Sequence, residues 1–168
     1  TFSGADTMGT QGLTSSDEAT IMVVLRTNNT TSFQVFASYH KDNNTTYRLL
    51  QLSTSSSSIR SSLDDNASPI FAAGSSTNNS YRVVTGTVKK GGNITSQYGN
   101  ETEGSTSGVP TTPFTVNSVT IGGITNNFTQ FALDGDIAEV LLFDAQLSVA
   151  DIADAKRYLS TKWNVPLF

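Results

Sequence analysis

Residues 133–168 constrain the fold of this chain more than any other segment. Within them, 137–143 reads IAEVLLF, a strand pattern that is apolar on both faces. A strand with two apolar faces has to be covered on both sides. Strict alternation sorts its apolar residues into two sets: Ile137, Leu141 and Phe143 on one face, and Ala138, Val140 and Leu142 on the other. We therefore predict that an opposing sheet covers one face and that a neighbouring element covers the other.

A helix pattern supplies that neighbouring element. Ser148 is a candidate N-cap, Asp151 makes a weaker capping box with it, and Asn164 fits a C-cap. Basic residues in the C-terminal half favour the helix dipole: Lys156, Arg157 and Lys162. Apolar residues recur at helical spacing and predict one buried face: Ile152, Ala155, Leu159 and Trp163. Trp163 is either a sugar-stacking platform or an anchor of the helix on the sheet, and its spacing favours the anchor.

The rest of the chain is rich in β-branched residues, with polar turns between apolar runs. These runs predict further strands at 20–27, 33–40, 47–53, 59–63, 81–89, 93–98 and 116–121. In the strand at 33–40, alternation predicts that Phe36 points away from the face shared by Phe33, Val35, Ala37 and Tyr39. Segments 64–79, 99–113 and 124–131 are expected to be loops, with an apolar patch at 70–73 that dips into the core.

Composition excludes several classes of function. The 168 residues fit one domain, there is no cysteine, and the formal net charge is −4. The acidic balance argues against nucleic acid as a partner, and no apolar run is long enough to insert in a membrane. The chain starts on Thr1, inside an apparent strand pattern. We therefore expect residues 1–168 to be a single domain and a fragment of a longer chain.

The C-terminal pattern also resembles a known family. F-x-x-D-G-D-I-A-E-V-L-L-F-D-x-x-L-S-x-x-D-I, running into Y-L-S-T-K-W-N-V, is similar to the C-terminal signature of concanavalin A-like lectin/glucanase domains of the laminin-G type. The opening Phe2-Ser3-Gly4-Ala5-Asp6 resembles the segment that begins the core of those domains. The resemblance implies an all-β jelly-roll sandwich of two antiparallel sheets, here with one short C-terminal α-helix. It also implies that residues 135–139 are hallmarks of structure rather than catalysts.

The nearest approach to a catalytic motif is a trio of carboxylates: Asp134, Asp136 and Glu139. A retaining glycosidase needs two carboxyl groups about 5–5.5 Å apart. Strict alternation places Glu139 on the face opposite the two aspartates, unless a β-bulge resets the phase. We therefore expect Asp136 and Glu139 to accept hydrogen bonds from nearby backbone or from a helix end. His40, the only histidine, lies at a predicted strand end and is expected to be solvated.

Binding residues are sought among aromatic and amide side chains near loops. A pocket for a polar ligand pairs an apolar wall with a few placed amides. The candidates for ligand binding are Tyr39, Tyr98, Asn127, Phe128 and Gln130, although each is also compatible with a core or ordinary surface position. No cofactor is required by the sequence, but calcium fits the carboxylate and amide oxygens of turn segments, with Asp64 and Asp65 as the candidate ligands.

These observations predict a non-catalytic recognition module that is carbohydrate-binding or adhesive. We expect it in a larger virion-surface or extracellular protein, within a multidomain or oligomeric assembly, with a glycan or a neighbouring structural protein as partner. The alternative is a structural virion module, such as a capsid-decoration, fibre or tail domain, that acts through protein–protein contacts. A glycoside hydrolase is the third and least favoured interpretation.

Overall fold

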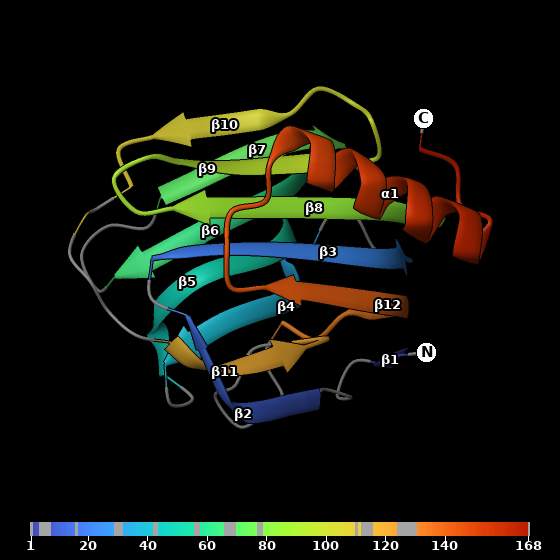
Figure 1. Cartoon of the computed structure of the whole chain (residues 1–168). Coiled ribbons are helices and arrows are strands. Elements are labelled where there is room, and N and C mark those ends of the chain that lie inside the picture. Colours follow the sequence, from blue (N-terminus) through green and yellow to red (C-terminus); the bar gives the residue numbers. More distant parts are fainter. Residues whose placement is uncertain are drawn as a thin grey trace.

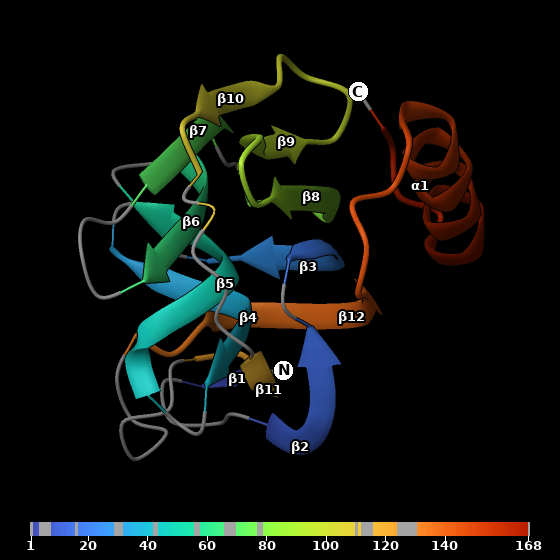
Figure 2. The same ribbon diagram turned by 60° about the vertical axis from the view of Figure 1, so that its left-hand side comes forward.

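Two antiparallel sheets pack face to face, and a single helix lies on the outside of one of them (Figure 1). The computed structural model describes residues 2–3, 8–15, 17–28, 32–41, 44–55, 58–65, 70–76, 79–109, 111, 116–123 and 131–167. The jelly-roll sandwich predicted from the sequence is confirmed. Figure 2 shows the layers in order: helix, first sheet, second sheet.

The sheet beneath the helix is called sheet I. Its six strands lie in the order β1 (Phe2–Ser3), β12 (Asp134–Phe143), β3 (Glu18–Thr27), β8 (Arg82–Lys89), β9 (Asn93–Tyr98) and β10 (Gly104–Ser107). The opposing sheet is called sheet II. Its six strands lie in the order β2 (Met8–Ser15), β11 (Val116–Ile121), β4 (Gln34–Lys41), β5 (Asn44–Ser55), β6 (Ser58–Asp65) and β7 (Ile70–Ser76).

β3 shows why the apolar runs fold as they do. Ile21, Val23 and Leu25 point into the core between the sheets. Met22 and Val24 point outward and pack against the helix. An unbroken apolar run is therefore the expected sequence for this strand, because both of its faces are covered.

Bulges in two strands make the observed alternation of side chains differ from the predicted one. In β4 the register shifts between Val35 and Ala37, and Phe36 lies in the core with Ala37. In β12 the register shifts between Ile137 and Glu139. A bulge puts one extra residue on one strand and resets the side-chain phase beyond it.

As a result, the apolar residues of β12 divide differently from the prediction. Ile137, Val140 and Leu142 face the core, whereas Ala138, Leu141 and Phe143 face the helix.

Two segments predicted as loops contain strands. β7 lies within the predicted loop 64–79, and β10 lies within the predicted loop 99–113. Each strand is at the edge of its sheet, beside β6 and β9 respectively. The apolar patch at 70–73 does reach the core, through Ala72.

The outer face of sheet II carries a row of polar side chains. Thr120, Ser38, Gln51 and Ser62 are partners across β11, β4, β5 and β6, and all four are buried. We call these four residues the polar row. Their neighbours along the strands, such as Tyr39 and Leu52, point the other way into the core. The polar row therefore faces outward.

The helix α1 (Val149–Trp163) begins and ends where the sequence predicts. Ser148 accepts a hydrogen bond from the backbone N–H of Asp151, and Asn164 takes the left-handed conformation with φ of 51°. The connection from β12 is fixed to sheet I, because the Thr20 hydroxyl donates to the carbonyl of Ala145 and accepts from the N–H of Leu147. In the described part of the chain, no helix has the length and apolar character required to cross a bilayer.

Candidate functional site

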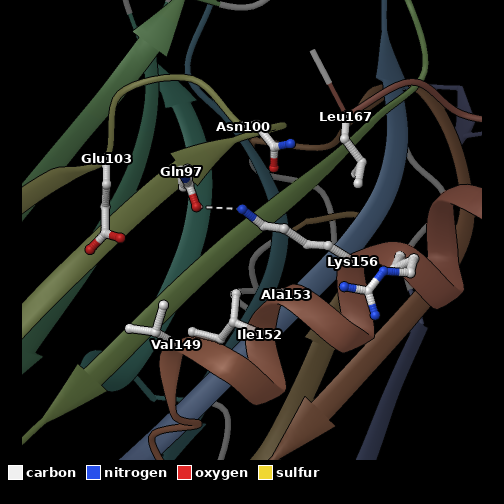
Figure 3. A pocket seen from close by; sticks show the side chains of 9 residues that line it. Gln97, Asn100, Glu103, Val149, Ile152, Ala153, Lys156 and Leu167 are labelled. Atoms are coloured by element: carbon white, nitrogen blue, oxygen red, sulfur yellow. Dashed lines mark hydrogen bonds between the residues drawn. The ribbon is translucent and has the colours of Figure 1, made fainter.

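A pocket of about 350 Å³ lies between α1 and the turn that follows β9 (Figure 3). One wall is apolar and comes mainly from the first turns of the helix. The other wall is polar and comes from β9 and the segment after it. The lining residues are Gln97, Asn100, Glu103, Val149, Ile152, Ala153, Lys156, Arg157 and Leu167.

Lys156 is the central polar residue of this pocket. Its side chain extends from α1 toward β9, and its ammonium donates to Gln97 Oε1 and, at 2.8 Å, to the carbonyl oxygen of Gly99. The residue is only 4 % exposed. The helix and the β9 turn are thus joined through one buried cation.

The local sequence explains this arrangement. Gly99 has φ of +58°, a conformation that other residues rarely adopt, and a Cβ there would lie 3.0 Å from the carbonyl oxygen of Leu167. The tight turn places the Gly99 carbonyl within reach of the helix. On α1, Lys156 follows Ile152 by four residues and precedes Leu159 by three, so it lies on the face that packs against the sheet.

Burial lowers the pKa of Lys156 to about 8, and the negative charge of Glu103 acts in the opposite direction. Among the described residues, no carboxylate forms an ion pair with this ammonium. Arg157, the second cation lining the pocket, pairs on the helix surface with Asp154 at 2.7 Å. Within the described residues, the pocket therefore combines a buried cation held by two neutral acceptors with one exposed acid.

A second polar cluster lies at the C-terminal end of α1. Glu139 of β12 accepts hydrogen bonds from Lys162 at 3.0 Å and from the indole N–H of Trp163. The Lys162 ammonium also lies over the rings of Tyr158 and Trp163, 5.2 and 5.6 Å from their centroids. Trp163 remains 41 % exposed. It therefore anchors the helix to the sheet through its indole hydrogen bond rather than through complete burial of its ring.

Two of the three carboxylates singled out as a possible catalytic motif are bound to cations, whereas Asp134 accepts a hydrogen bond from the side-chain amide of Asn28 at 3.1 Å. Because of the bulge in β12, Glu139 lies on the helix side of sheet I. Asp136 forms an ion pair with Arg26. Burial opposes the charged form of Glu139, but hydrogen bonds from Trp163, Lys162 and Tyr158 outweigh it and lower its pKa. The expected hydrogen bond from a helix end is present at Glu139.

Three residues with predicted surface roles are buried. Tyr39 and Tyr98 lie in the core between the sheets, 3 % and 1 % exposed, and burial raises the pKa of Tyr39 to about 12. Rings enclosed in this way offer no face to a ligand, which corrects their assignment as binding residues. His40 is also buried rather than solvated, because β4 is an interior strand of sheet II.

The other predicted site residues lie, as whole residues or in their side chains, outside the described part of the chain. Asn127, Phe128 and Gln130 lie outside the described residues. Asp64 and Asp65 end β6, opposite Arg48 and Tyr47 of β5, and their side chains are also outside the described part. Within the described residues, no group of three His, Asp or Glu side chains is suitably placed to hold a metal ion.

The pocket residues were missed because each has an ordinary explanation in the sequence. Lys156 reads as a residue that favours the helix dipole, and Gln97 and Asn100 read as part of a strand and its turn. One signal was available: Lys156 is a charged residue within the apolar stripe defined by Ile152 and Leu159. A charge inside such a stripe marks a buried cation that requires partners.

Solved structures with the same fold include glycan-binding domains. The CBM40 of the Ruminococcus gnavus IT-sialidase, bound to α2,6 sialyllactose, has a TM-score of 0.68 and 13 % identity over 89 % of this chain and 98 % of that chain. The same domain bound to α2,3 sialyllactose has a TM-score of 0.67 and 12 % identity, over 84 % and 83 % of the two chains.

A botulinum neurotoxin type C structure, described as dependent on two ganglioside molecules for cell entry, has a TM-score of 0.63 and 15 % identity. The match covers 85 % of this chain but only 36 % of the toxin chain. At these identities the likeness is one of fold.

Sequence comparison gives the family. No curated protein matches the chain. A laminin-G family model, described as "Concanavalin A-like lectin/glucanases superfamily", matches residues 3–153. The sandwich with its terminal helix therefore belongs to the concanavalin A-like lectin/glucanases superfamily.

Proposed function

We propose that this chain is a non-catalytic carbohydrate-binding module that takes one sugar residue in the pocket beside α1. The observation that carries the proposal is that an apolar wall and a polar wall face each other across the pocket. Val149, Ile152 and Ala153 form an apolar wall, and the side-chain amides of Gln97 and Asn100 face it (Figure 3). Sugars present apolar C–H faces and a rim of hydroxyls, which suit an apolar wall with a few placed amides.

The size of the pocket supports a single sugar residue. Small-molecule sites have volumes of roughly 300–1,000 Å³, and this pocket, at about 350 Å³, is near the lower end. The glycan-binding domains with the same fold support the same class of ligand.

A glycan array followed by calorimetric titration of the best ligand tests the proposal. Asn100→Ala should weaken binding, and Asn79→Ala, an exposed asparagine that does not line the pocket, should leave it unchanged. The proposal fails if no glycan binds, or if Asn100→Ala binds the best ligand as tightly as the wild-type protein. Repeating the titration with a chelator tests our further proposal that Asp64 and Asp65 hold calcium.

The charges around two of the carboxylates support the non-catalytic assignment. The general acid of a glycosidase requires a raised pKa, whereas the pKa of Glu139 is lowered and Asp136 is paired with Arg26. The assignment would be wrong if the chain hydrolysed a bound glycan and Glu139→Gln abolished that hydrolysis.

A structural module acting through protein contacts is the second candidate. It is favoured by Tyr158 and Trp163, which are 50 % and 41 % exposed on α1. This alternative retains the virion-surface or extracellular setting in a larger assembly that we propose from the composition. Self-association or partner binding that is lost in Tyr158→Ala, together with an absence of glycan binding, would support it over the first candidate.

A further inference from the structure

In the part of the chain that the structure describes, the buried ammonium of Lys156 is held by neutral groups. Its two printed acceptors, Gln97 Oε1 and the Gly99 carbonyl, are neutral oxygens, and the described residues provide no ion pair for it. Removing a cation from water is costly unless an opposite charge compensates, and a pair formed away from water is stronger than one on the surface. A ligand that brings a negative charge would therefore be preferred at this position.

We propose that the sugar recognised by this pocket bears a carboxylate, and that the ammonium of Lys156 pairs with it. The proposal rests on the proposed function and specifies its ligand class. An ammonium has three N–H donors. Two of them are used within the described residues, and the third remains for a carboxylate oxygen.

The other lining residues fit the rest of such a sugar. The side-chain amide of Asn100 lies on the same side of the pocket as Gln97, where it can meet ring hydroxyls (Figure 3). Val149 and Ile152 on the opposite side can pack against the C–H face of the ring. A single acidic pyranose thus has one partner for its charge, one for its hydroxyls and one for its apolar face.

The remaining charged residues of the pocket make the proposal testable. Glu103 is exposed, and its negative charge acts on Lys156. It would repel a ligand carboxylate. Arg157 would attract one, although its guanidinium is partly neutralised by Asp154. Net selectivity for acidic sugars is therefore set by the buried Lys156 and opposed by Glu103.

The ligand class is tested by calorimetric titration of the whole chain at pH 7 with matched pairs of sugars. Sialyllactose is compared with lactose, and glucuronic acid with glucose, so that the two common sources of a sugar carboxylate are distinguished. A hydrogen bond to a charged group is stronger than one between two neutral groups. We therefore expect the acidic member of at least one pair to bind on the order of tenfold tighter.

Two variants then test the role of Lys156. Lys156→Met should abolish the preference for the acidic member, with circular dichroism used to verify that the chain still folds. Glu103→Gln, a change at an exposed lining residue, should raise the ratio of acidic-sugar to neutral-sugar affinity several-fold.

The possible outcomes separate the two proposals. Equal affinity for the acidic and neutral members overturns the carboxylate assignment but leaves the proposed function standing. Failure of every sugar to bind overturns the proposed function itself. A preference for the acidic member that neither Lys156→Met nor Glu103→Gln alters overturns the assignment to Lys156.

Discussion

The outer faces of the two sheets are built from different side chains and are covered differently. On sheet I, Met22, Val24 and Val83 are apolar and pack against α1, which adds a third layer. On sheet II, the polar row consists of short hydroxyl side chains and one amide, all buried. The helix layer produces a pocket with a buried cation, and the polar row contains no charge. Among these described residues, a buried cation thus lies where the helix meets the sheet and not in the polar row.

The largest effect is expected from a variant that weakens the packing of α1 on sheet I. Leu159 is fully buried against sheet I, and truncation of a buried leucine to alanine costs about 2–5 kcal/mol. Leu159→Ala should lower the free energy of unfolding by that order and weaken glycan binding, because α1 supplies the apolar wall of the pocket. Urea denaturation and calorimetry measure both effects. Unchanged glycan affinity in a destabilised variant would show that the pocket does not depend on the seating of the helix.

The next test uses the pH dependence of stability. Lys156 has a folded pKa of about 8 and an unfolded pKa near 10.5, so the unfolded chain binds more protons between these values. The contribution of Lys156 to the free energy of unfolding should therefore rise as pH increases from about 8 to about 10.

Comparison with Lys156→Met isolates this contribution from those of other groups. Between about pH 8 and pH 10, the free energy of unfolding of the wild-type chain should increase relative to that of Lys156→Met. Parallel pH profiles of the two proteins would contradict the burial of the ammonium.

A smaller effect is expected at the start of the helix. The Ser148 hydroxyl accepts from the N–H of Asp151 at 3.2 Å. Loss of an N-cap costs typically about 1 kcal/mol. Ser148→Ala should therefore destabilise the chain by about that amount in thermal or urea denaturation, and Ser148→Asp should restore most of the loss. Equal stability of Ser148→Ala and the wild-type chain would indicate that α1 is held by packing alone.

The smallest effect is expected in the polar row. The buried hydroxyl of Thr120 has no hydrogen-bond partner among the described residues. Replacing such a group by an apolar one of the same shape is neutral or stabilising. Thr120→Val should raise the free energy of unfolding by up to about 1 kcal/mol.

Thr87→Val is the matched control for Thr120→Val, because the Thr87 hydroxyl is paired with the Thr95 hydroxyl at 2.9 Å. The control should destabilise the chain. Destabilisation by Thr120→Val of the same size would show that its hydroxyl is satisfied in solution.

The sequence predicts the elements that are specified by side-chain pattern. β3, β8, β9, β12 and α1 have apolar periodicity or cap residues, and all were predicted close to their observed bounds. β7 and β10 were missed because they are edge strands rich in small residues, which are held by backbone pairing to one neighbour. The bulge in β4 was missed and the bulge in β12 was left open as an alternative, because a shift in register leaves no fixed mark in composition.

The candidate site was less predictable than the fold. Its residues come from β9, the turn after it, α1 and the C-terminal segment, and only the packing of the helix brings them together. Tyr39 and Tyr98 were chosen as surface aromatics, but strand phase places both in the core. The buried position of Lys156 could have been predicted from one observation, which is that a charged residue interrupts the apolar stripe of the helix.

Side-chain amide signals provide the most direct test of where the glycan binds. Gln97 lines the pocket and Gln51 lies in the polar row, so the same chemical group reports on both faces. In a nuclear magnetic resonance titration with the best glycan, the Gln97 amide signals should shift to saturation and those of Gln51 should remain unchanged. Shifts at Gln51 with no change at Gln97 would contradict recognition beside the helix and place it on sheet II.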